Sequence, residues 1–171
     1  IRNRTEAGIS YIPEDRHSYG LFLDFDLATN LALKQYYREP FSSKGILNKE
    51  EFEQSGSRLI DKYDIRSGQG VKTQVRSMSG GNQQKAIIAR EIELQSSLMI
   101  FVQPTRGVDI GAIENIHKMI IQERDRGKAI LLISLELDEI MNVADTIGVI
   151  YNGQLQKIAS RESLTTNEVG E

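Results

Sequence analysis

The chain has 171 residues, 39% of them hydrophobic and 26% charged, which is the composition of a globular protein. Its net charge of -3 gives no sign of a nucleic-acid binder, and the absence of cysteine excludes a disulfide scaffold and any thiolate metal site. No apolar run approaches the roughly 20 residues that a membrane helix needs. Because the sequence opens on polar residues without an initiating Met, we expect residue 1 to be an internal position of a longer protein.

The first half of the chain predicts one short strand followed mainly by helices. Residues 8–12 alternate in character and end at Pro13, as a strand would. The charged residues 14–20 predict a surface loop. Periodicity then predicts two helices, at residues 27–34 and 49–63. Breaker residues predict a turn-rich segment between them, at residues 40–45. In the second of these helices the expected inward positions are Phe52, Leu59, Ile60 and Tyr63.

The second half alternates helices with strands. Helical patterns cover three segments, residues 81–94, 110–126 and 136–144. Apolar runs at residues 98–102 and 129–133 predict two buried strands, and Asn152-Gly153 predicts the turn of a hairpin over residues 146–159. This alternation predicts an α/β fold with a mostly parallel sheet and helices on its faces.

The order of these elements also predicts where a site would lie. In open α/β sheets, ligands bind at the carboxyl ends of the strands. The loops that follow Ile12, Val102 and Ile133 are therefore the informative ones. The mainly helical first half would form a separate lobe beside the sheet.

The most specific motif is Ser77-Met78-Ser79-Gly80-Gly81-Asn82-Gln83-Gln84-Lys85. Its two glycines let the backbone approach a ligand closely, and they stand at the start of an expected helix, where free amides favour an anion. Ser79 can cap this helix or donate its hydroxyl to a phosphate oxygen. On these residues alone both interpretations stay open.

The whole string resembles the signature motif of ATP-binding cassette (ABC) ATPases, in the form found in monosaccharide and nucleoside importers. The resemblance implies a partial ABC-ATPase core, which is a P-loop NTPase fold, with a mostly parallel sheet and a helical lobe. It implies that the signature loop (residues 79–82) closes over ATP held by a partner domain. Ser79, Gly80 and Gly81 would contact its γ-phosphate in trans, with Asn82 beside them.

A second motif, residues 98–109, resembles the Walker B strand and the D-loop of this family. Where the family has an Asp that helps to hold Mg²⁺ and a Glu that polarises the attacking water, this chain has Val102 and Gln103. Valine cannot ligate magnesium, and Gln103 can orient a water but cannot accept its proton. Gln103 is alternatively only a polar residue at a strand end. Asp109 matches the D-loop Asp of the nucleotide site and can also cap the following helix.

A third motif lies at the end of the next strand. Leu135 stands where the family has its switch His, and leucine cannot hydrogen-bond a γ-phosphate. The nearby Asp138 and Glu139 are expected to be solvated helix charges rather than catalysts.

Residues 11–16 resemble the Q-loop, which joins the core to the helical lobe. Glu14 replaces the usual Gln, so that an acceptor oxygen is kept and the amide donor is lost. In the family this region meets the membrane subunit, which makes residues 14–23 a candidate transmission surface. The simpler alternative is a surface ion pair of Arg16 with Glu14 or Asp15.

Two absences complete the picture. No Gly-x-x-x-x-Gly-Lys-[Ser/Thr] phosphate-binding loop occurs in the sequence, although the family places one before the Q-loop. His17 and His117 are isolated, so no metal site is expected. ATP and Mg²⁺ are therefore expected as cofactors of the intact protein, and we predict these residues alone to be inactive as an ATPase.

The departures from the family pattern are selective. Val102, Gln103 and Leu135 weaken the site that this domain would build around its own nucleotide, whereas the signature loop is intact. The resemblance implies the C-terminal nucleotide-binding domain of a tandem ATPase subunit from a nucleoside or simple-sugar importer. Residues 14–95 would form its helical lobe and residues 96–160 its α/β core.

The implied partners are the N-terminal nucleotide-binding domain of the same chain, the transmembrane permease subunits and, indirectly, a solute-binding lipoprotein. The place would be the cytoplasmic face of the cell membrane, and no nucleic acid is expected. Two alternatives stay open. A non-catalytic scaffold with the ABC fold would explain the lost acids but not the intact signature. An SMC-type DNA-repair ATPase head shares the Ser-Gly-Gly signature, but it needs heptad arms and a basic surface, and neither is visible in this sequence.

Overall fold

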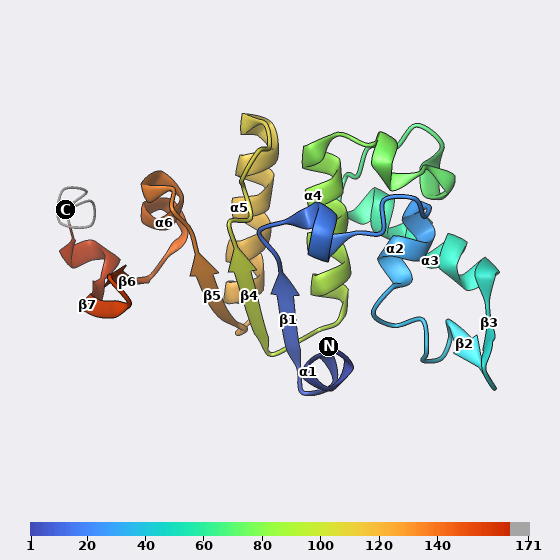
Figure 1. Ribbon diagram of the computed structural model, residues 1–171, viewed down its shortest axis with the longest axis horizontal. Helices are drawn as coiled ribbons and strands as arrows, with labels where there is room; N and C mark the ends of the chain where they lie inside the picture. Colours follow the sequence, from blue (N-terminus) through green and yellow to red (C-terminus); the bar gives the residue numbers. More distant parts are fainter. Residues whose placement is uncertain (165–171) are drawn as a thin grey trace.

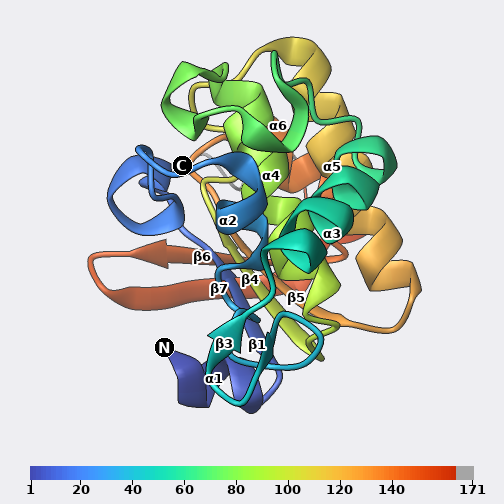
Figure 2. The ribbon, with the colours of Figure 1, turned by 90° about the vertical axis from the view of Figure 1, so that its right-hand side faces the viewer.

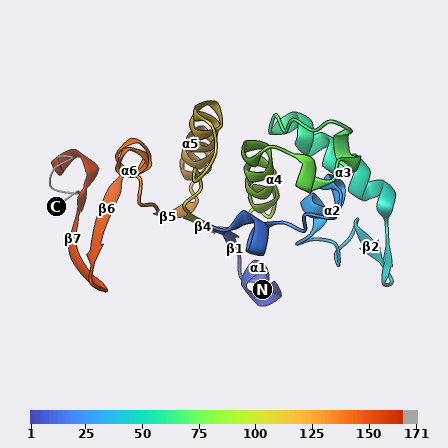
Figure 3. The same ribbon diagram turned by 45° about the horizontal axis from the view of Figure 1, so that its top comes forward.

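A three-stranded parallel sheet forms the centre of the fold, with α4 and α5 on one side of it (Figures 1 and 3). The computed structural model describes residues 1–164. The strands are β1 (Ile9–Ile12), β4 (Leu98–Val102) and β5 (Ala129–Ile133), in the order β1-β4-β5. Ile12 lies opposite Phe101 and Val102 opposite Ile133, so the carboxyl ends of all three strands reach the same edge. The predicted α/β fold with a parallel sheet is confirmed.

Polar caps set the beginning of the main helices. The bounds are α1 (Arg2–Glu6), α2 (Leu27–Ala32), α3 (Lys49–Lys62), α4 (Gly80–Glu93), α5 (Ile110–Asp125) and α6 (Leu137–Val143). The capping side chains accept a hydrogen bond from the amide three residues further on, and they are Asp26, Asn48, Ser79 and Asp109. Each cap satisfies one of the amides that a helix start leaves without a partner. α1 was not predicted, because it has no side-chain cap and buries none of its residues.

α4 lies in the middle of the core, between the sheet and the other helices. Its Ile87 and Ile88 are fully buried against Met99 and Phe101 of β4 and Ile116 of α5, all inaccessible to solvent. The sequence predicts only an apolar stripe on this helix. The structure buries it almost all round, including polar residues that find partners inside the fold.

A buried ionic cluster joins α4 to β1 and α2. The Glu91 carboxylate, which is inaccessible to solvent, accepts a hydrogen bond from Lys34 Nζ at 2.8 Å and from Arg90 Nε at 3.1 Å. It also accepts from the Tyr11 amide at 3.4 Å, while Arg90 Nη1 donates to the Asn30 carbonyl at 3.3 Å. Burying these charges is tolerable only because they are paired and hydrogen-bonded. The cluster therefore fixes α2 and α4 to the strand that leads into the Q-loop.

The helices α2 and α3 form a side lobe next to α4. Phe52, Leu59 and Tyr63 of α3 are buried as predicted, and Ile60 is half-buried against the main core. Phe52 also packs edge-on against Phe41, with ring centroids 5.6 Å apart. The turn-rich segment before α3 forms a small hairpin of β2 (Ser42–Ser43) and β3 (Ile46–Leu47) at the end of this lobe (Figure 1).

The prediction that residues 129–133 form a buried strand was wrong in one respect. They form β5, but Leu131 and Ile133 are about half exposed, at 49% and 48%. β5 is the outer strand of this sheet, and α4 and α5 cover only the face that Ile130 and Leu132 share (Figure 3). An apolar run alone does not tell a strand covered on two faces from one covered on a single face.

The predicted hairpin follows α6 and is formed by β6 (Thr146–Tyr151) and β7 (Gln154–Ser160). Asn152 and Gly153 have φ values of 49° and 75° and make its turn, which requires the left-handed conformation at both positions. Figure 2 shows the hairpin projecting away from the helices. Among the described residues, no helix is both long and apolar enough to cross a membrane.

The loop predicted at residues 14–20 is partly helical. Arg16–Gly20 form a π-helical turn, capped by Asp15, which accepts hydrogen bonds from the amides of His17 at 3.0 Å and Ser18 at 2.9 Å. These hydrogen bonds, the Ser18 amide first, lower the pKa of Asp15. The polar composition of this segment concealed a local structure that depends on one capping side chain.

Candidate functional site

Three loops meet at the carboxyl edge of the sheet, as the strand order predicts. The Gln103 amide donates to the Ile133 carbonyl at 2.8 Å, which ties the loop after β4 to the end of β5. From the loop after β1, Glu14 forms an ion pair with Arg106, and Arg16 Nη1 donates to the Arg106 carbonyl at 2.9 Å. The D-loop (residues 103–109) is therefore held from both sides.

The signature loop lies at the start of α4 and borders this meeting point. Ser79 is exposed, and its Oγ accepts from Asn82 Nδ2 at 2.8 Å and, at the longer distance of 3.5 Å, from the Asn82 amide. Both contacts use the oxygen as an acceptor, which leaves the hydroxyl proton to donate to an anion. The cap and the phosphate-donor interpretations of Ser79 are therefore compatible.

Both glycines of the loop stand where a side chain would be crowded by its surroundings. A Cβ on Gly80 would lie 2.9 Å from Arg16 Nη2 and 3.2 Å from the Gly107 carbonyl oxygen. A Cβ on Gly81 would lie 3.1 Å from Ala112 Cβ and 3.1 Å from Asp109 Oδ2. Gly80 thus lies close to the D-loop backbone, and Gly81 lies close to side chains at the start of α5.

The remaining signature-loop residue faces a small polar cavity. Asn82 Oδ1 accepts from the Arg66 amide at 2.8 Å, so the side chain is held from both its ends. The cavity has a volume of about 320 Å³, and its lining comes from α4, the start of α5 and the segment after α3: Asp64, Arg66, Gly81, Asn82, Lys85, Asp109, Gly111, Ala112 and Asn115. Asp109 lies here as the cap of α5, where its Oδ1 accepts from the Ala112 amide at 2.9 Å.

The two positions that the resemblance predicts to match catalytic residues of the family lie at the same edge but differ in setting. Gln103 is buried, with a φ of 50°, an uncommon conformation for a residue other than glycine. Leu135 is 89% exposed. Val102, the third residue of this group, is half-buried. This group offers no carboxylate and no imidazole, so its chemistry does not fit a magnesium ion. Within residues 1–164, no group of three or more His, Cys, Asp or Glu is placed to hold a metal.

The structure contradicts the alternative of a local ion pair at Arg16. Glu14 pairs with Arg106, which is 92 residues away in the sequence, and not with Arg16. Arg16 donates to backbone carbonyls instead of pairing with Glu14 or Asp15. Sequence proximity suggested the local pairs, whereas the fold brings the two loops together.

Neither histidine is isolated, contrary to expectation. His17 Nε2 lies 2.9 Å from Gln83 Oε1, which links the turn after Asp15 to α4. His117 Nε2 lies 3.2 Å from Glu139 Oε1. Glu139 was expected to be solvated, but it is only 3% exposed, because α6 packs this residue against α5.

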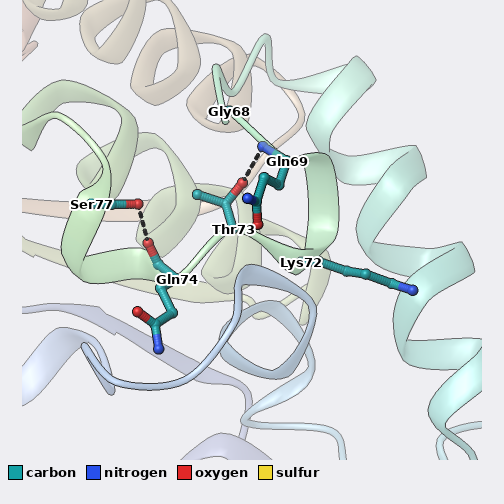
Figure 4. Close-up of a pocket in the computed structure, with 6 residues that line it drawn as sticks. All are labelled: Gly68, Gln69, Lys72, Thr73, Gln74 and Ser77. Carbon is teal, nitrogen blue, oxygen red and sulfur yellow. Dashed lines mark hydrogen bonds between the residues drawn. The ribbon is translucent and has the colours of Figure 1, made fainter.

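A second depression, of about 460 Å³, lies just before the signature loop (Figure 4). One segment forms all of it, with Gly68, Gln69, Lys72, Thr73, Gln74 and Ser77 as its lining. Its polar groups largely bond to one another: the Gln69 amide donates to Thr73 Oγ1 at 2.8 Å, and Ser77 Oγ donates to the Gln74 carbonyl at 2.8 Å. The side chain of Lys72 points away, toward Glu53 of α3. This depression is therefore not the candidate site.

Known proteins match the chain in both sequence and structure, although no protein-family model matches it. It is 48% identical over 169 residues to a guanosine import ATP-binding protein of Bacillus subtilis (strain 168) and 51% identical over 169 residues to a nucleoside import ATP-binding protein of Lactococcus lactis subsp. cremoris (strain MG1363). Each match covers 99% of this chain and 33% of the relative. A ribose import ATP-binding protein of Bacillus licheniformis is 37% identical over 164 residues, covering 96% of this chain and 33% of the relative.

Solved structures agree on the fold. A nucleotide-free ATP-binding cassette from an ABC transporter superposes with a TM-score of 0.75 at 16% identity, covering 99% of this chain and 68% of that one. A dimeric ATP-binding cassette bound to ADP and phosphate superposes with a TM-score of 0.74 at 16% identity, covering 95% and 66%. The fold is that of the ABC ATPases. The chain is homologous to nucleoside and simple-sugar import ATP-binding proteins, and it spans about a third of the length of the curated relatives it matches.

Proposed function

We propose that these residues are the C-terminal part of a nucleotide-binding domain in a longer ABC importer subunit for nucleosides or simple sugars. Their contribution is a signature loop that completes the ATP site of a partner domain. The observation that carries this proposal is the start of α4, where the oxygen of the exposed Ser79 serves as an acceptor for Asn82, so that its hydroxyl can donate to a phosphate, and where two glycines follow.

The start of α4 suits a γ-phosphate for simple electrostatic reasons. α4 has 14 residues, and its first amides and its dipole favour negative charge at this end. Gly80 is half-buried and Gly81 is buried, while the exposed Ser79 hydroxyl adds a donor that is already oriented by its contacts with Asn82. Donors held in place before the charge develops stabilise a transition state without further reorganisation.

The same chain would contribute little to a nucleotide site of its own. We propose that Gln103 orients a water at most, and that Leu135 and Val102 provide neither the switch nor the metal ligand. Glu14 is engaged with Arg106, and Asp109 caps α5. The subunit would thus be asymmetric: ATP and Mg²⁺ act mainly at the site that the signature loop completes.

An exposed aromatic surface supports a membrane partner. Tyr19, Phe22 and Phe25 are 81%, 53% and 51% exposed, and the rings of Phe22 and Phe25 stack with centroids 5.6 Å apart. Exposed apolar groups gathered beside the Q-loop favour a protein contact. We assign this surface, with residues 14–23, to a transmembrane permease subunit at the cytoplasmic face of the membrane.

The other partners follow from the same proposal. An N-terminal nucleotide-binding domain of the same chain would face the signature loop, and a solute-binding lipoprotein would act indirectly through the permease. The division into a helical lobe at residues 14–95 and an α/β core at residues 96–160 is part of this proposal.

The test is ATP turnover by the full-length subunit assembled with its permease, comparing Gly80→Ala and Gly80→Asp with Gly68→Asp. Gly80→Ala introduces only the steric conflict, and Gly80→Asp adds a negative charge facing the γ-phosphate. Gly68 has open space around it and serves as the matched control. We expect turnover to fall at least tenfold in Gly80→Asp, less in Gly80→Ala, and not at all in Gly68→Asp. One lost donor of this kind costs about 10²–10³ in rate.

Unchanged turnover in a folded Gly80→Asp subunit would overturn the proposal. The loop would then serve no nucleotide site, and the non-catalytic scaffold would become the better description. The importer homologues and the absence of a basic surface in the sequence leave the DNA-repair alternative without support.

A further inference from the structure

Arg16 lies where the Q-loop, the D-loop and the signature loop meet. Its Nη1 donates to the Arg106 carbonyl at 2.9 Å and its Nη2 to the Gly107 carbonyl at 3.3 Å. Arginine can bridge two acceptors in this way because its donors form a rigid planar fork. A Cβ on Gly80 would lie 2.9 Å from the same Nη2 and 3.4 Å from Cζ of Arg16. One guanidinium thus contacts the signature loop and bonds to the D-loop.

The segment that carries Arg16 is itself fixed to α4. His17 bonds to Gln83, and Gln83 Nε2 donates to the Val75 carbonyl at 2.9 Å just before the signature loop. Gly20 lies so close to α4 that a Cβ on it would be 2.6 Å from Ile87 Cδ1. The segment that carries Arg16 is therefore packed against α4, and from there Arg16 donates to the D-loop.

A second contact connects the same two segments. Glu14 forms its ion pair with the side chain of Arg106, whose carbonyl accepts from Arg16. Glu14 and Arg16 thus hold one D-loop residue by its side chain and by its backbone. The ion pair is exposed and contributes little by itself. The Arg16 bridge, which lies against Gly80, is the contact that links all three loops.

We infer that Arg16 is a positioning residue that holds the signature loop and the D-loop at a fixed separation, so that both reach the partner domain as one unit. This inference rests on the proposed function, because the signature loop must serve a partner site for its position to matter. Arg16 acts through the backbone of Gly80, Arg106 and Gly107 and has no assigned contact with nucleotide. A movement of the Q-loop would then shift both loops together.

Hydrogen–deuterium exchange of the full-length assembled subunit, without nucleotide, tests the bridge directly. The Arg106 and Val108 amides bond within the D-loop, to the Gln103 and Thr105 carbonyls at 3.2 and 3.3 Å, and they report its order. In Arg16→Ala we expect these amides to exchange about tenfold faster or more, as two lost hydrogen bonds would give. In Arg16→Lys the same amides should exchange nearly as fast as in Arg16→Ala, since one ammonium cannot bridge both carbonyls.

Arg124→Ala is the matched control, because it removes an arginine that bonds to Asp125 and Asp145 at the far end of α5. ATP turnover provides a second readout through a double-mutant cycle. If Arg16 limits the space at Gly80, then Gly80→Ala should impair turnover at least threefold less in the Arg16→Ala background than in the wild type. A role confined to overall stability would leave the two effects independent.

The outcomes separate this inference from the proposed function. Unchanged D-loop exchange in both Arg16 variants would overturn the bridge, even if the wild type turns over ATP normally. Faster exchange with additive effects on turnover would overturn the positioning role and leave only a structural contact. If Gly80→Asp leaves ATP turnover unchanged when Arg16 is present, the proposed function is overturned. The exchange data would still decide whether the bridge exists. If Arg16→Ala does not fold, Arg16→Lys carries the same test.

Discussion

Replacing Glu91 by alanine should loosen the junction between the Q-loop strand and the helical lobe more than any surface change does. The carboxylate is inaccessible to solvent and is the acceptor for Lys34, Arg90 and the Tyr11 amide. Its removal leaves Arg90, whose side chain is only 3% exposed, without a compensating charge. Breaking a buried ion pair by removing one partner costs about 3–5 kcal/mol. We therefore expect a loss of this size in the free energy of unfolding.

Glu93 provides a matched control on the same helix. Its carboxylate also has two partners, Lys62 Nζ and the Tyr63 hydroxyl, both at 2.7 Å. It is 28% exposed and Lys62 is 55% exposed, so water replaces much of what Glu93→Ala removes. We expect that change to cost about 1 kcal/mol.

The assay is pulse proteolysis of the full-length subunit across a urea series, with mass spectrometry assigning the protected peptides to residues 1–164. The urea midpoint of these peptides should fall clearly further for Glu91→Ala than for Glu93→Ala. Equal shifts would refute the reasoning, because burial would then add nothing to the stabilisation that the ion pairs of Glu91 provide. Faster exchange of the Tyr11 amide in Glu91→Ala alone would place the effect at the junction itself.

Two further predictions concern the nucleotide site and acid stability. The triple change Val102→Asp, Gln103→Glu and Leu135→His should restore the nucleotide site that this domain builds for itself. ATP turnover in the Gly80→Asp background should therefore rise at least tenfold. No rise would count against the asymmetric subunit. The pKa of Asp64 is lowered, first by the hydrogen bond from Lys85 and then by the charge of that residue. Its stabilising contribution is therefore present above the unfolded-state pKa of about 3.9 and is lost as the pH falls through the lower folded-state pKa. The melting temperature of Asp64→Asn should fall less than that of the wild type between pH 5 and pH 2.5, and equal losses would contradict the assignment.

Sequence patterns were sufficient wherever a local physical cause determines the structure. The apolar spacing of α3 places Phe52, Leu59 and Tyr63 in the core, and Asn152-Gly153 requires the left-handed turn of the final hairpin. The position of the candidate site also followed, because parallel strands bring their carboxyl ends to one edge.

The contacts that the sequence did not predict are those between distant segments. Glu14 and Arg106 are 92 residues apart, and Arg16 is 91 residues from Gly107. Nothing in either segment indicates its partner, and charge pairing within a short stretch suggested a wrong local pair. Glu139 was misjudged for a related reason: a carboxylate on a short helix reads as solvated unless the packing of the neighbouring helix is known.

The close packing of the signature loop affects how its preservation should be interpreted. Gly80 and Gly81 lie close to Arg16, Asp109 and Ala112, so packing within the fold disfavours side chains there, whatever the loop does for a partner. Leu135, at 89% exposure, is under no comparable packing constraint. Intact glycines are therefore weaker evidence of function than they look. The comparison between Gly80→Ala and Gly80→Asp separates the two demands, because both variants carry the steric conflict and only one adds charge facing the partner's phosphate. A further loss of turnover in Gly80→Asp, at a melting temperature equal to that of Gly80→Ala, would mean that the loop is kept for a phosphate as well as for packing.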